Sequence, residues 1–337
     1  MKNKKQNNRK KRALPIILIV LAVIYLTAAQ LIMTFTMVPS FMEKMDAAFS
    51  SLTQKGMSEQ VVSEEIEQNE DKAWDDTLTW LDTLDWRKLK MASDDGADLI
   101  AAEFRQEDPA APWILLLHGY TGSKEELYPY ACRYFARGYS LLVPDLRAQG
   151  ESGGKYIGMG VLDRADLLKW LSYINREYPD APVILCGQSM GASAALMLGA
   201  DPALPGCVKA VISDCAFTDA LSLFKNKEKD WIGIPDPGLI DTAGLLLKLE
   251  AGYGLKEASA LQAMAKSSLP TLFIHGEEDR IVPLSNAYSL YNTCTSQQKK
   301  LLTFPGAGHA QSADKDPEKY YDAVFSFIDS VLQDNAR

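Results

Sequence analysis

A serine flanked by two glycines is the strongest chemical signal in this sequence. The segment 187–191 reads Gly-Gln-Ser-Met-Gly; it follows the apolar run Val183–Cys186 and precedes small residues that favour a helix. A serine on such a tight strand-to-helix turn forms a nucleophile elbow, where flanking glycines avoid steric clashes. An N-cap serine in an ordinary turn would give the same short pattern. The strand and helix around the motif favour the first interpretation, and we expect Ser189 to act as a nucleophile.

A serine hydroxyl is a weak nucleophile unless a base activates it, and the chain offers three histidines for that task. His309 lies in a glycine-rich stretch, after the last apolar strand and before the final helix. Nucleophile, acid and histidine in this chain order make a known catalytic arrangement. A solvent-facing loop histidine is the alternative. We expect His309 to be the base, and His275 to shape the turn that carries the acid.

The acid should follow the preceding strand, where the segment 276–283 carries three carboxylates. We favour Asp279 because the turn brings its short side chain toward His309, whereas Glu277 and Glu278 should be solvated. Asp214, after the strand Val208–Ser213, is the alternative. The acid would fix the imidazole tautomer and stabilise the imidazolium.

An oxyanion formed by attack on a carbonyl needs two N–H donors. Met190, directly after the nucleophile, should supply one. The other should come from the loop 118–123 after the strand Trp113–Leu117, with Tyr120 N–H as the expected donor. We expect His118 to form a hydrogen bond within that loop.

From residue 112 onward, short apolar strands alternate with helices, which predicts an α/β fold with a mostly parallel sheet covered on both faces. A hairpin over Trp86–Phe104 should precede it. Residues 216–262 interrupt the alternation, and we expect a lid there, whose side chains would line an acyl pocket or pack together. The expected strands are Trp113–Leu117, Ser140–Val143, Val183–Cys186, Val208–Ser213, Thr271–Ile274 and Lys300–Phe304; the expected helices are Glu125–Arg137, Val161–Arg176, Met190–Leu198 and Tyr320–Leu332.

The motifs together resemble those of serine hydrolases of the α/β-hydrolase superfamily, and are most similar to the small-lid branch with Bem46-like proteins, S33-type serine aminopeptidases and monoacylglycerol-lipase-like enzymes. The resemblance covers roughly residues 86–335. It rests on the segments 118–122, 143–152, 187–191, 276–283 and 308–309. Ala148-Gln149 stands where relatives often carry Gly-His, and Gln188 occupies a variable position. The family implies Ser189, Asp279 and His309 as the triad and Tyr120 and Met190 as oxyanion donors.

Such a triad performs two-step acyl transfer and requires no metal or cofactor. We expect a carboxylesterase or lipase-like enzyme acting on uncharged or lipid-like acyl esters. A peptidase or thioesterase would use the same triad, and a catalytically silent, membrane-tethered binding module is the alternative from another class of protein.

The N-terminal region predicts a membrane anchor. Residues 13–42 contain no charged side chain, and about 20 apolar residues suffice for a transmembrane helix. Residues 1–12 carry seven Lys and Arg, which favours a cytoplasmic N-terminus and an extracytoplasmic catalytic domain in the cell membrane. A signal peptide cleaved near Ala28-Ala29 is the alternative. We therefore divide the chain into a basic tail 1–12, an anchor 13–40, an acidic helical stalk 41–85 whose later part packs on the domain, and a hydrolase domain 86–337.

Charge and cysteine usage limit the other classes of function. The chain has a formal net charge of -9 in spite of its basic tail, so the remainder is poorly suited to binding nucleic acid. Five cysteines without zinc-like spacing predict neither a disulfide framework nor a metal site.

Overall fold

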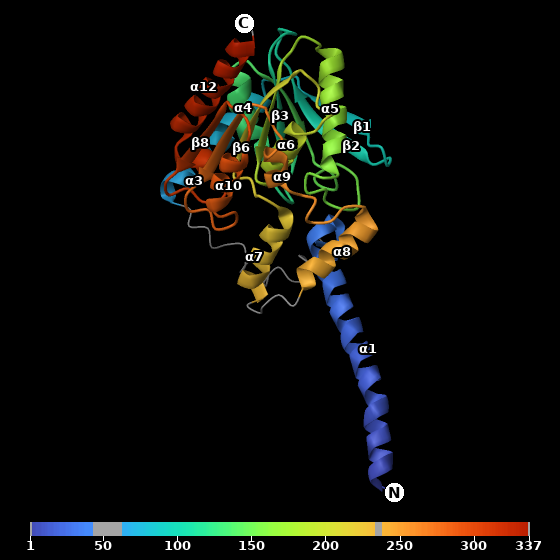
Figure 1. Ribbon diagram of the computed structural model, residues 1–337. Coiled ribbons are helices and arrows are strands. Elements are labelled where there is room, and N and C mark those ends of the chain that lie inside the picture. The colour runs from blue at the N-terminus through green and yellow to red at the C-terminus, as the bar shows by residue number, and fades with distance from the viewer. Residues whose placement is uncertain (1, 43–62, 233–237, 336–337) are drawn as a thin grey trace.

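The computed structural model describes residues 2–42, 63–232 and 238–335. In the described residues, eight strands form one sheet, which runs through the middle of the catalytic domain (Figure 1). The strand order is β1-β2-β4-β3-β5-β6-β7-β8; β1 and β2 are antiparallel, and all strands from β3 onward are parallel. The strands are β1 Arg87–Ala92, β2 Asp98–Phe104, β3 Trp113–Leu117, β4 Ser140–Pro144, β5 Val183–Gln188, β6 Val208–Asp214, β7 Thr271–Gly276 and β8 Lys299–Phe304.

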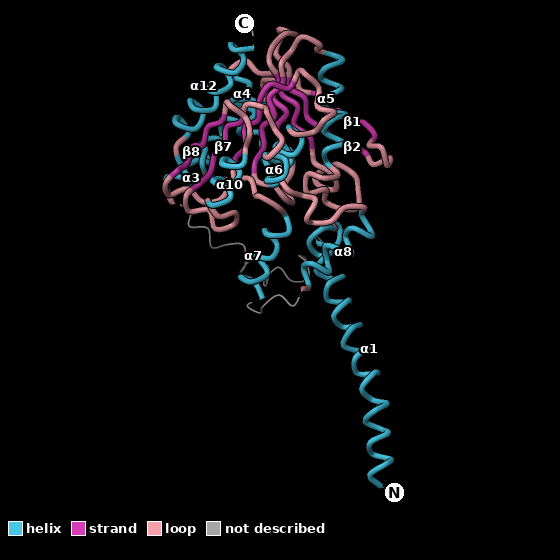
Figure 2. Tube along the Cα trace, viewed as in Figure 1, coloured by secondary structure: helices cyan, strands magenta, loops and turns pink. Residues whose placement is uncertain are grey.

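Helices cover both faces of the sheet (Figure 2). The helices are α1 Lys2–Met37, α3 Glu64–Leu81, α4 Tyr128–Ala136, α5 Asp163–Glu177, α6 Met190–Gly199, α7 Ala220–Ile232, α8 Leu239–Ala251, α9 Ala260–Met264, α10 Ser285–Thr293, α11 Ser312–Lys315 and α12 Pro317–Asn335, with a 3₁₀ turn at Lys124–Leu127. One core lies between the sheet and α5, α6 and α9, and a second lies between the sheet and α3, α4 and α12.

The central strands show why the sequence folds in this way. All five side chains of β3 are buried; Trp113, Leu115 and Leu117 belong to one core, while Ile114 and Leu116 belong to the other. A parallel strand covered on both faces reads as a continuous apolar run. The predicted α/β architecture, a mostly parallel sheet covered by helices on both faces, is thereby confirmed. The helix α10 was not predicted, and α5 begins at Asp163, two residues later than expected.

Helix α3 occupies the later part of the expected stalk; residues 43–62 lie outside the described part of the chain. Its N-cap Ser63 accepts a hydrogen bond from Ile66 N, and Ile66 itself is buried. The Trp80 ring lies 4.9 Å from that of Phe104 on β2. This part of the chain is therefore packed onto the domain.

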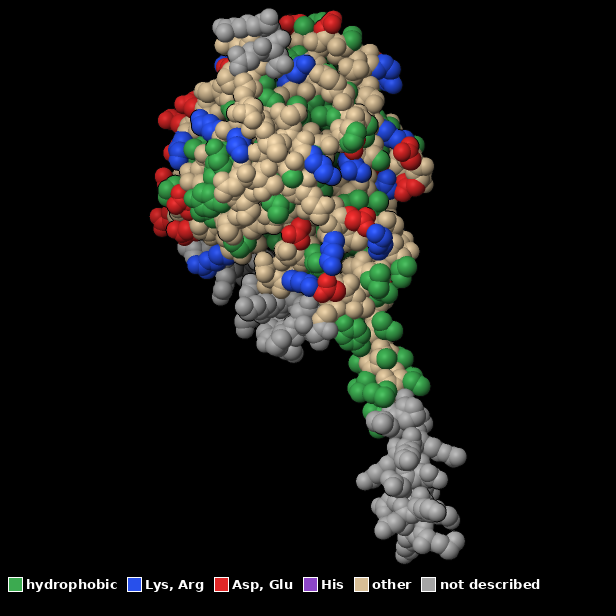
Figure 3. All heavy atoms as spheres, in the orientation of Figure 1, with side chains coloured by type: hydrophobic (Ala, Val, Ile, Leu, Met, Phe, Trp, Pro, Cys, Tyr) green, Lys and Arg blue, Asp and Glu red, His purple; other side chains and the backbone are tan. Residues whose placement is uncertain are grey.

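Helix α1 leaves the domain as a long helix, and its described side chains next to the domain are mostly hydrophobic (Figures 1 and 3). Residues Ile17–Met37 are long and apolar enough to cross a membrane. The final turns, however, belong to the domain core, because Met33 and Met37 are buried there and Met37 O accepts a hydrogen bond from Ile157 N. The expected anchor 13–40 thus overlaps the catalytic domain at its end.

The expected lid region contains α7, α8 and the start of α9. Phe217 and Tyr253 are buried in the core, whereas Leu245 of α8 is 58% exposed, so Leu245 does not line an internal pocket. The Trp231 side chain and Ile234, which belong to the same region, lie outside what the structure describes. All five cysteines are free thiols.

Candidate active site

The turn between β5 and α6 holds Ser189 in a strained backbone conformation. Its φ of 55° and ψ of -114° lie where residues other than glycine are rare. A Cβ on Gly191 would lie 2.2 Å from Leu117 O, so a glycine is required for α6 to approach β3 this closely. Ser189 N donates to Asp214 O at 2.8 Å, which ties the turn to the end of β6.

The structure brings Ser189, His309 and Asp279 together. His309 Nε2 lies 2.8 Å from Ser189 Oγ, and His309 Nδ1 lies 2.7 Å from Asp279 Oδ2. A carboxylate at Nδ1 keeps the proton on that nitrogen, so Nε2 is free to accept the serine proton. Ser189 and His309 are part-exposed, while Asp279 is buried. This geometry suits activation of the serine hydroxyl for attack on a carbonyl.

Asp279 is held as a carboxylate by several donors. Its Oδ1 accepts hydrogen bonds from Ile281 N and Val282 N, each at 2.8 Å. Burial alone would raise the pKa of Asp279, but hydrogen bonds from His275 and His309 outweigh it and lower the pKa to about 2. His275 Nε2 lies 2.8 Å from Val282 O and 3.3 Å from Asp279 Oδ2, so this histidine shapes the acid's turn. Glu277 and Glu278 are exposed.

The acid and base loops touch directly, and a glycine makes this possible. A Cβ on Gly276 would lie 2.4 Å from both Ala307 O and Gly308 O. Glu278 N donates to Ala307 O at 2.9 Å across the same contact. The loops after β7 and β8 are thereby locked at the distance that the Asp279–His309 hydrogen bond needs.

Asp214, the alternative acid, has other contacts. Its Oδ2 accepts a hydrogen bond from Tyr320 Oη at 3.0 Å, and its buried Oδ1 has no hydrogen-bond partner within the described residues. Burial raises the pKa of Asp214 to about 7 in spite of that hydrogen bond. His309 is hydrogen-bonded to Asp279 and not to Asp214.

The two segments that carry the expected oxyanion donors lie beside the nucleophile. A Cβ on Gly119 would lie 3.7 Å from Ser189 Cβ, so the loop after β3 passes next to the serine. Over the described ranges of the chain, no hydrogen bond engages the backbone N–H of Tyr120 or of Met190. Two uncommitted N–H groups near a nucleophile are what an oxyanion hole requires.

Three polar contacts position the loop 118–123, the expected oxyanion loop, and the sequence predicted only one of them. His118 does bond within its loop, with Nδ1 donating to Gly119 O at 2.7 Å; its Nε2 also accepts from Leu146 N at 2.9 Å. Gln149 Oε1 accepts from Thr121 N at 2.6 Å. The segment 145–152 after β4 therefore supports the oxyanion loop, and the residue at 149 contributes directly. The type of Gln149 alone gave no signal of this contact.

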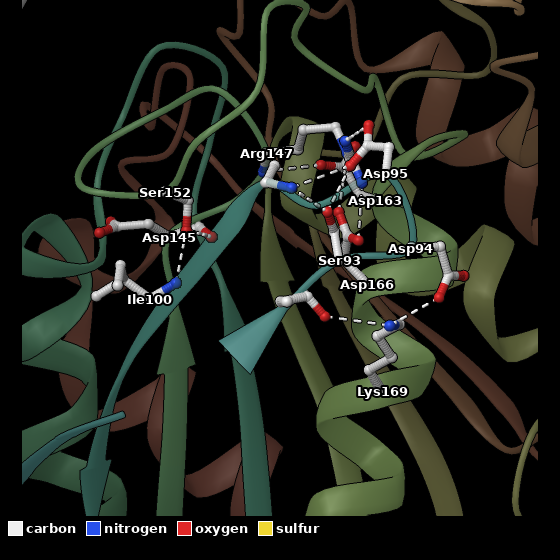
Figure 4. A network of polar contacts seen from close by, with 12 residues as sticks. Ser93, Asp94, Asp95, Ile100, Asp145, Arg147, Ser152, Asp163, Asp166 and Lys169 are labelled. Carbon is white, nitrogen blue, oxygen red and sulfur yellow. Dashed lines mark hydrogen bonds and ion pairs between the residues drawn. The ribbon is translucent and has the colours of Figure 1, made fainter. Parts of the chain in front are cut away.

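A buried ion-pair network fixes that supporting segment in turn (Figure 4). Arg147 makes two hydrogen bonds of 2.9 Å to the Asp166 carboxylate on α5 and one of 2.6 Å to Asp95 in the β1–β2 turn. On the other side, Asp145 accepts from Lys124 N and Lys124 Nζ, at 2.8 and 2.7 Å. The bidentate pairing of Arg147 with Asp166 fixes the geometry of this segment strongly.

Among the described residues, one group of side chains has the atom types of a metal site, and two of its members belong to the expected triad. Candidate ligand atoms of Cys215, Asp279 and His309 lie within 4.8 Å of one another. The 2.7 Å separation of Asp279 Oδ2 and His309 Nδ1 is a hydrogen bond, and it is too short for two ligands that each lie about 2.0 Å from a zinc ion in tetrahedral geometry. The group does not fit a metal in this arrangement.

Comparisons with known proteins agree with the fold. The chain is 29% identical over 219 residues to the uncharacterised protein YqkD of Bacillus subtilis, covering 65% of this chain and 71% of that protein. It is 26% identical to a monoacylglycerol lipase of Mycolicibacterium smegmatis, covering 65% of this chain and 88% of the lipase. The esterase Pf2001 of Pyrococcus furiosus superposes with a TM-score of 0.61 at 20% identity, covering 74% of this chain and 92% of the esterase.

A family model extends the agreement over most of the domain. The model described as the prolyl oligopeptidase family matches residues 127–335, which is more than half of the chain and includes Ser189, Asp279 and His309. The protein is a serine hydrolase of the α/β-hydrolase superfamily and belongs to the prolyl oligopeptidase family.

Proposed function

We propose that this protein is a membrane-anchored hydrolase that cleaves carboxylic esters through an acyl-enzyme on Ser189. The observation that supports this proposal most directly is the continuous hydrogen-bonded chain from Ser189 Oγ through His309 to Asp279. His309 would take the serine proton during attack, and the N–H groups of Tyr120 and Met190 would hold the oxyanion. The protonated His309 then passes its proton to the leaving alcohol. Water activated by the same histidine releases the carboxylic acid.

The preference for esters is supported by the surroundings of the oxyanion loop and by the relatives. The Tyr120 ring lies edge-on to Phe224 of α7, with centroids 6.2 Å apart, so two aromatic side chains lie next to the expected oxyanion loop. Relatives include the monoacylglycerol lipase and an esterase named above. An uncharged acyl group suits such side chains because its burial removes apolar area from water.

We propose further that α1 is a retained anchor, with the basic tail 1–12 in the cytoplasm and the catalytic domain on the other side of the cell membrane. Charge asymmetry supports this orientation. Retention is supported by Tyr25, whose hydroxyl lies 2.9 Å from Thr242 Oγ1, and by Ala29, which is fully buried. Tyr25 precedes the possible cleavage site at Ala28-Ala29, and Ala29 is part of it. Cleavage there would therefore remove contacts that the domain uses.

A substrate panel tests the ester proposal. The full chain in detergent is given p-nitrophenyl esters of increasing chain length and, in parallel, aminoacyl anilides, with Ser189→Ala as the control. We expect Ser189-dependent turnover of short- and medium-chain esters. Turnover of anilides alone would contradict the proposal.

A peptidase is the second candidate, and a specific observation favours it: the matching family is described as that of prolyl oligopeptidase. The triad serves amide and ester bonds alike. The same panel separates the two candidates, since a peptidase would prefer the anilides.

A further inference from the structure

The contacts of α1 with the catalytic domain begin unexpectedly early along the helix. Tyr25 Oη lies 2.9 Å from Thr242 Oγ1 of α8, and Gln30 Nε2 donates to Glu250 Oε1 at 2.9 Å. Helix α8 thus lies along α1 where α1 leaves the domain (Figure 1).

The length of α1 fixes the depth of α8. The last charged residue before the apolar stretch is Arg12, and the rise from there to Tyr25 is about 20 Å in an α-helix. The hydrocarbon core of a bilayer is about 30 Å thick and needs about 20 helical residues. A spanning α1 is therefore still within the hydrocarbon when it meets α8, and any tilt of α1 lengthens the part that must remain inside.

The exposed face of α8 suits that environment. Leu245 and Leu249 lie four residues apart on one side of the helix and are 58% and 75% exposed. Outside α1, the other exposed large apolar side chains of the described residues are Leu78 and Tyr288, which lie on separate helices and are 58% and 48% exposed. Two exposed leucines one turn apart, on a helix that packs against the apolar part of α1, offer an apolar contact to lipid.

The charged groups of α8 have partners, which lowers the cost of placing the helix near hydrocarbon. Asp241 pairs with Lys225, and Lys248 pairs with Glu257. Glu250 accepts hydrogen bonds from Gln30 and from Tyr156 Oη. Paired ions lose less on leaving water than isolated ones.

The same end of α1 reaches the catalytic machinery. Tyr120, whose N–H is a proposed oxyanion donor, donates its hydroxyl to Thr36 O of α1. Its backbone lies in the loop that passes the nucleophile at Gly119. The side chain of Tyr120 therefore links the anchor helix directly to the loop that carries a proposed oxyanion donor.

We propose that α8 is immersed in the leaflet on the catalytic-domain side of the membrane, and that the substrate is a carboxylic ester lipid of that leaflet. The substrate part rests on the proposed function. Lipid would reach Ser189 from the bilayer beside α1 and α8, without crossing bulk water, and the acid and alcohol products would return to the same surface.

Kinetics on two kinds of ester test the proposal. The full chain is reconstituted in phosphatidylcholine vesicles as wild type, as Leu245→Glu with Leu249→Glu, and as Leu78→Glu. Leu78 is the matched control because it is also 58% exposed but lies on α3. Each is given water-soluble p-nitrophenyl acetate and, separately, vesicles containing monooleoylglycerol, dioleoylglycerol or phosphatidylcholine alone.

We expect the α8 double variant to hydrolyse the vesicle-borne ester at least 10-fold more slowly than wild type, because charged side chains are costly in hydrocarbon. Its rate on p-nitrophenyl acetate should stay within about twofold of wild type, because surface substitutions rarely disturb folding. Leu78→Glu should match wild type on both. Equal loss on both esters, no loss on either, or a wild type active only on the soluble ester would overturn the proposal. A folded wild type inactive on both would instead remove the proposed function.

A depth measurement decides the position of α8 without any turnover. Leu249→Cys and Leu78→Cys carry a fluorophore in a background where the part-exposed Cys132 and Cys207 are serine. Lipids bearing a nitroxide on the acyl chain should quench the label at position 249 several-fold more than the label at position 78. Equal quenching at the two positions would overturn the immersion of α8.

Discussion

The ends of β6 and β7 each present a buried carboxyl group near the nucleophile, and the two groups behave differently. Asp279, after β7, accepts two backbone N–H bonds and contacts two histidines, and its pKa falls to about 2. Asp214, at the end of β6, has one tyrosine donor, and burial raises its pKa to about 7. The difference teaches that the number of donors, more than depth, decides whether a buried carboxyl is a usable anion.

The largest expected effect comes from exchanging each acid for its amide. Asp279→Asn should lower kcat/KM by about 10⁴-fold, because the amide cannot hold His309 in the required tautomer. Asp214→Asn should stay within about 10-fold of wild type. Steady-state kinetics on a p-nitrophenyl ester measure both. A larger loss for Asp214→Asn than for Asp279→Asn would reverse the assignment of the acid.

A smaller effect should follow from removing a donor to Asp279. His275→Leu should lower kcat by about 10-fold with little change in KM, because His275 positions the acid's turn and does not face the substrate. His275→Gln keeps an N–H donor and should recover part of the rate. If the two variants are equally active, the hydrogen bond has no positioning role.

The stability of the Asp214 region should depend on pH in a defined direction. The folded pKa of Asp214 lies above the unfolded value, so the folded protein binds more protons between about pH 4 and 7, and stability from this group falls as pH rises through that window. Asp214→Asn removes the free-energy cost of ionising this buried carboxyl group. Relative to wild type, its free energy of unfolding should rise by on the order of 2 kcal/mol from pH 5 to pH 8. Urea unfolding in detergent, followed by near-ultraviolet circular dichroism, measures it; a pH-independent difference would contradict the raised pKa.

The smallest expected effect belongs to Tyr320. Tyr320→Phe removes the hydroxyl that donates to Asp214 and should cost about 1 kcal/mol of stability, more at pH 8 than at pH 5, because the ionised carboxylate depends on that donor more than the acid does. The same unfolding experiment at two pH values checks it. Tyr321→Phe, on the next residue, is the control, and it should show no such pH dependence.

The elements that sequence could predict are those built from local signals. The strand before Ser189, the glycines at its turn and the helix after it are contiguous, so pattern and sterics point the same way. Asp279 and His309 were predictable because each follows a strand whose end lies at the same edge of the sheet. Helix α10 was missed because its sequence, SNAYSLYNT, is poor in strong helix formers.

What the sequence could not predict depends on contacts between distant segments. Gln149 supports Thr121 across 28 residues, and an amide side chain carries no sign of its partner. Met33 and Met37 lie in an apolar stretch whose composition suits lipid and protein core equally, so their burial in the domain appeared only in the fold. For the same reason, the hydrogen bond between Tyr120 and α1 could not be predicted from the sequence.

The assignment of Ser189 as nucleophile is tested most directly by covalent labelling. The full chain is treated with a fluorophosphonate, digested, and mapped by mass spectrometry, beside Ser189→Ala and a heat-unfolded sample. We predict one adduct, on the peptide carrying Ser189, in folded wild type and none in either control. A folded wild type that remains unlabelled, or an adduct that persists in Ser189→Ala, would contradict the account.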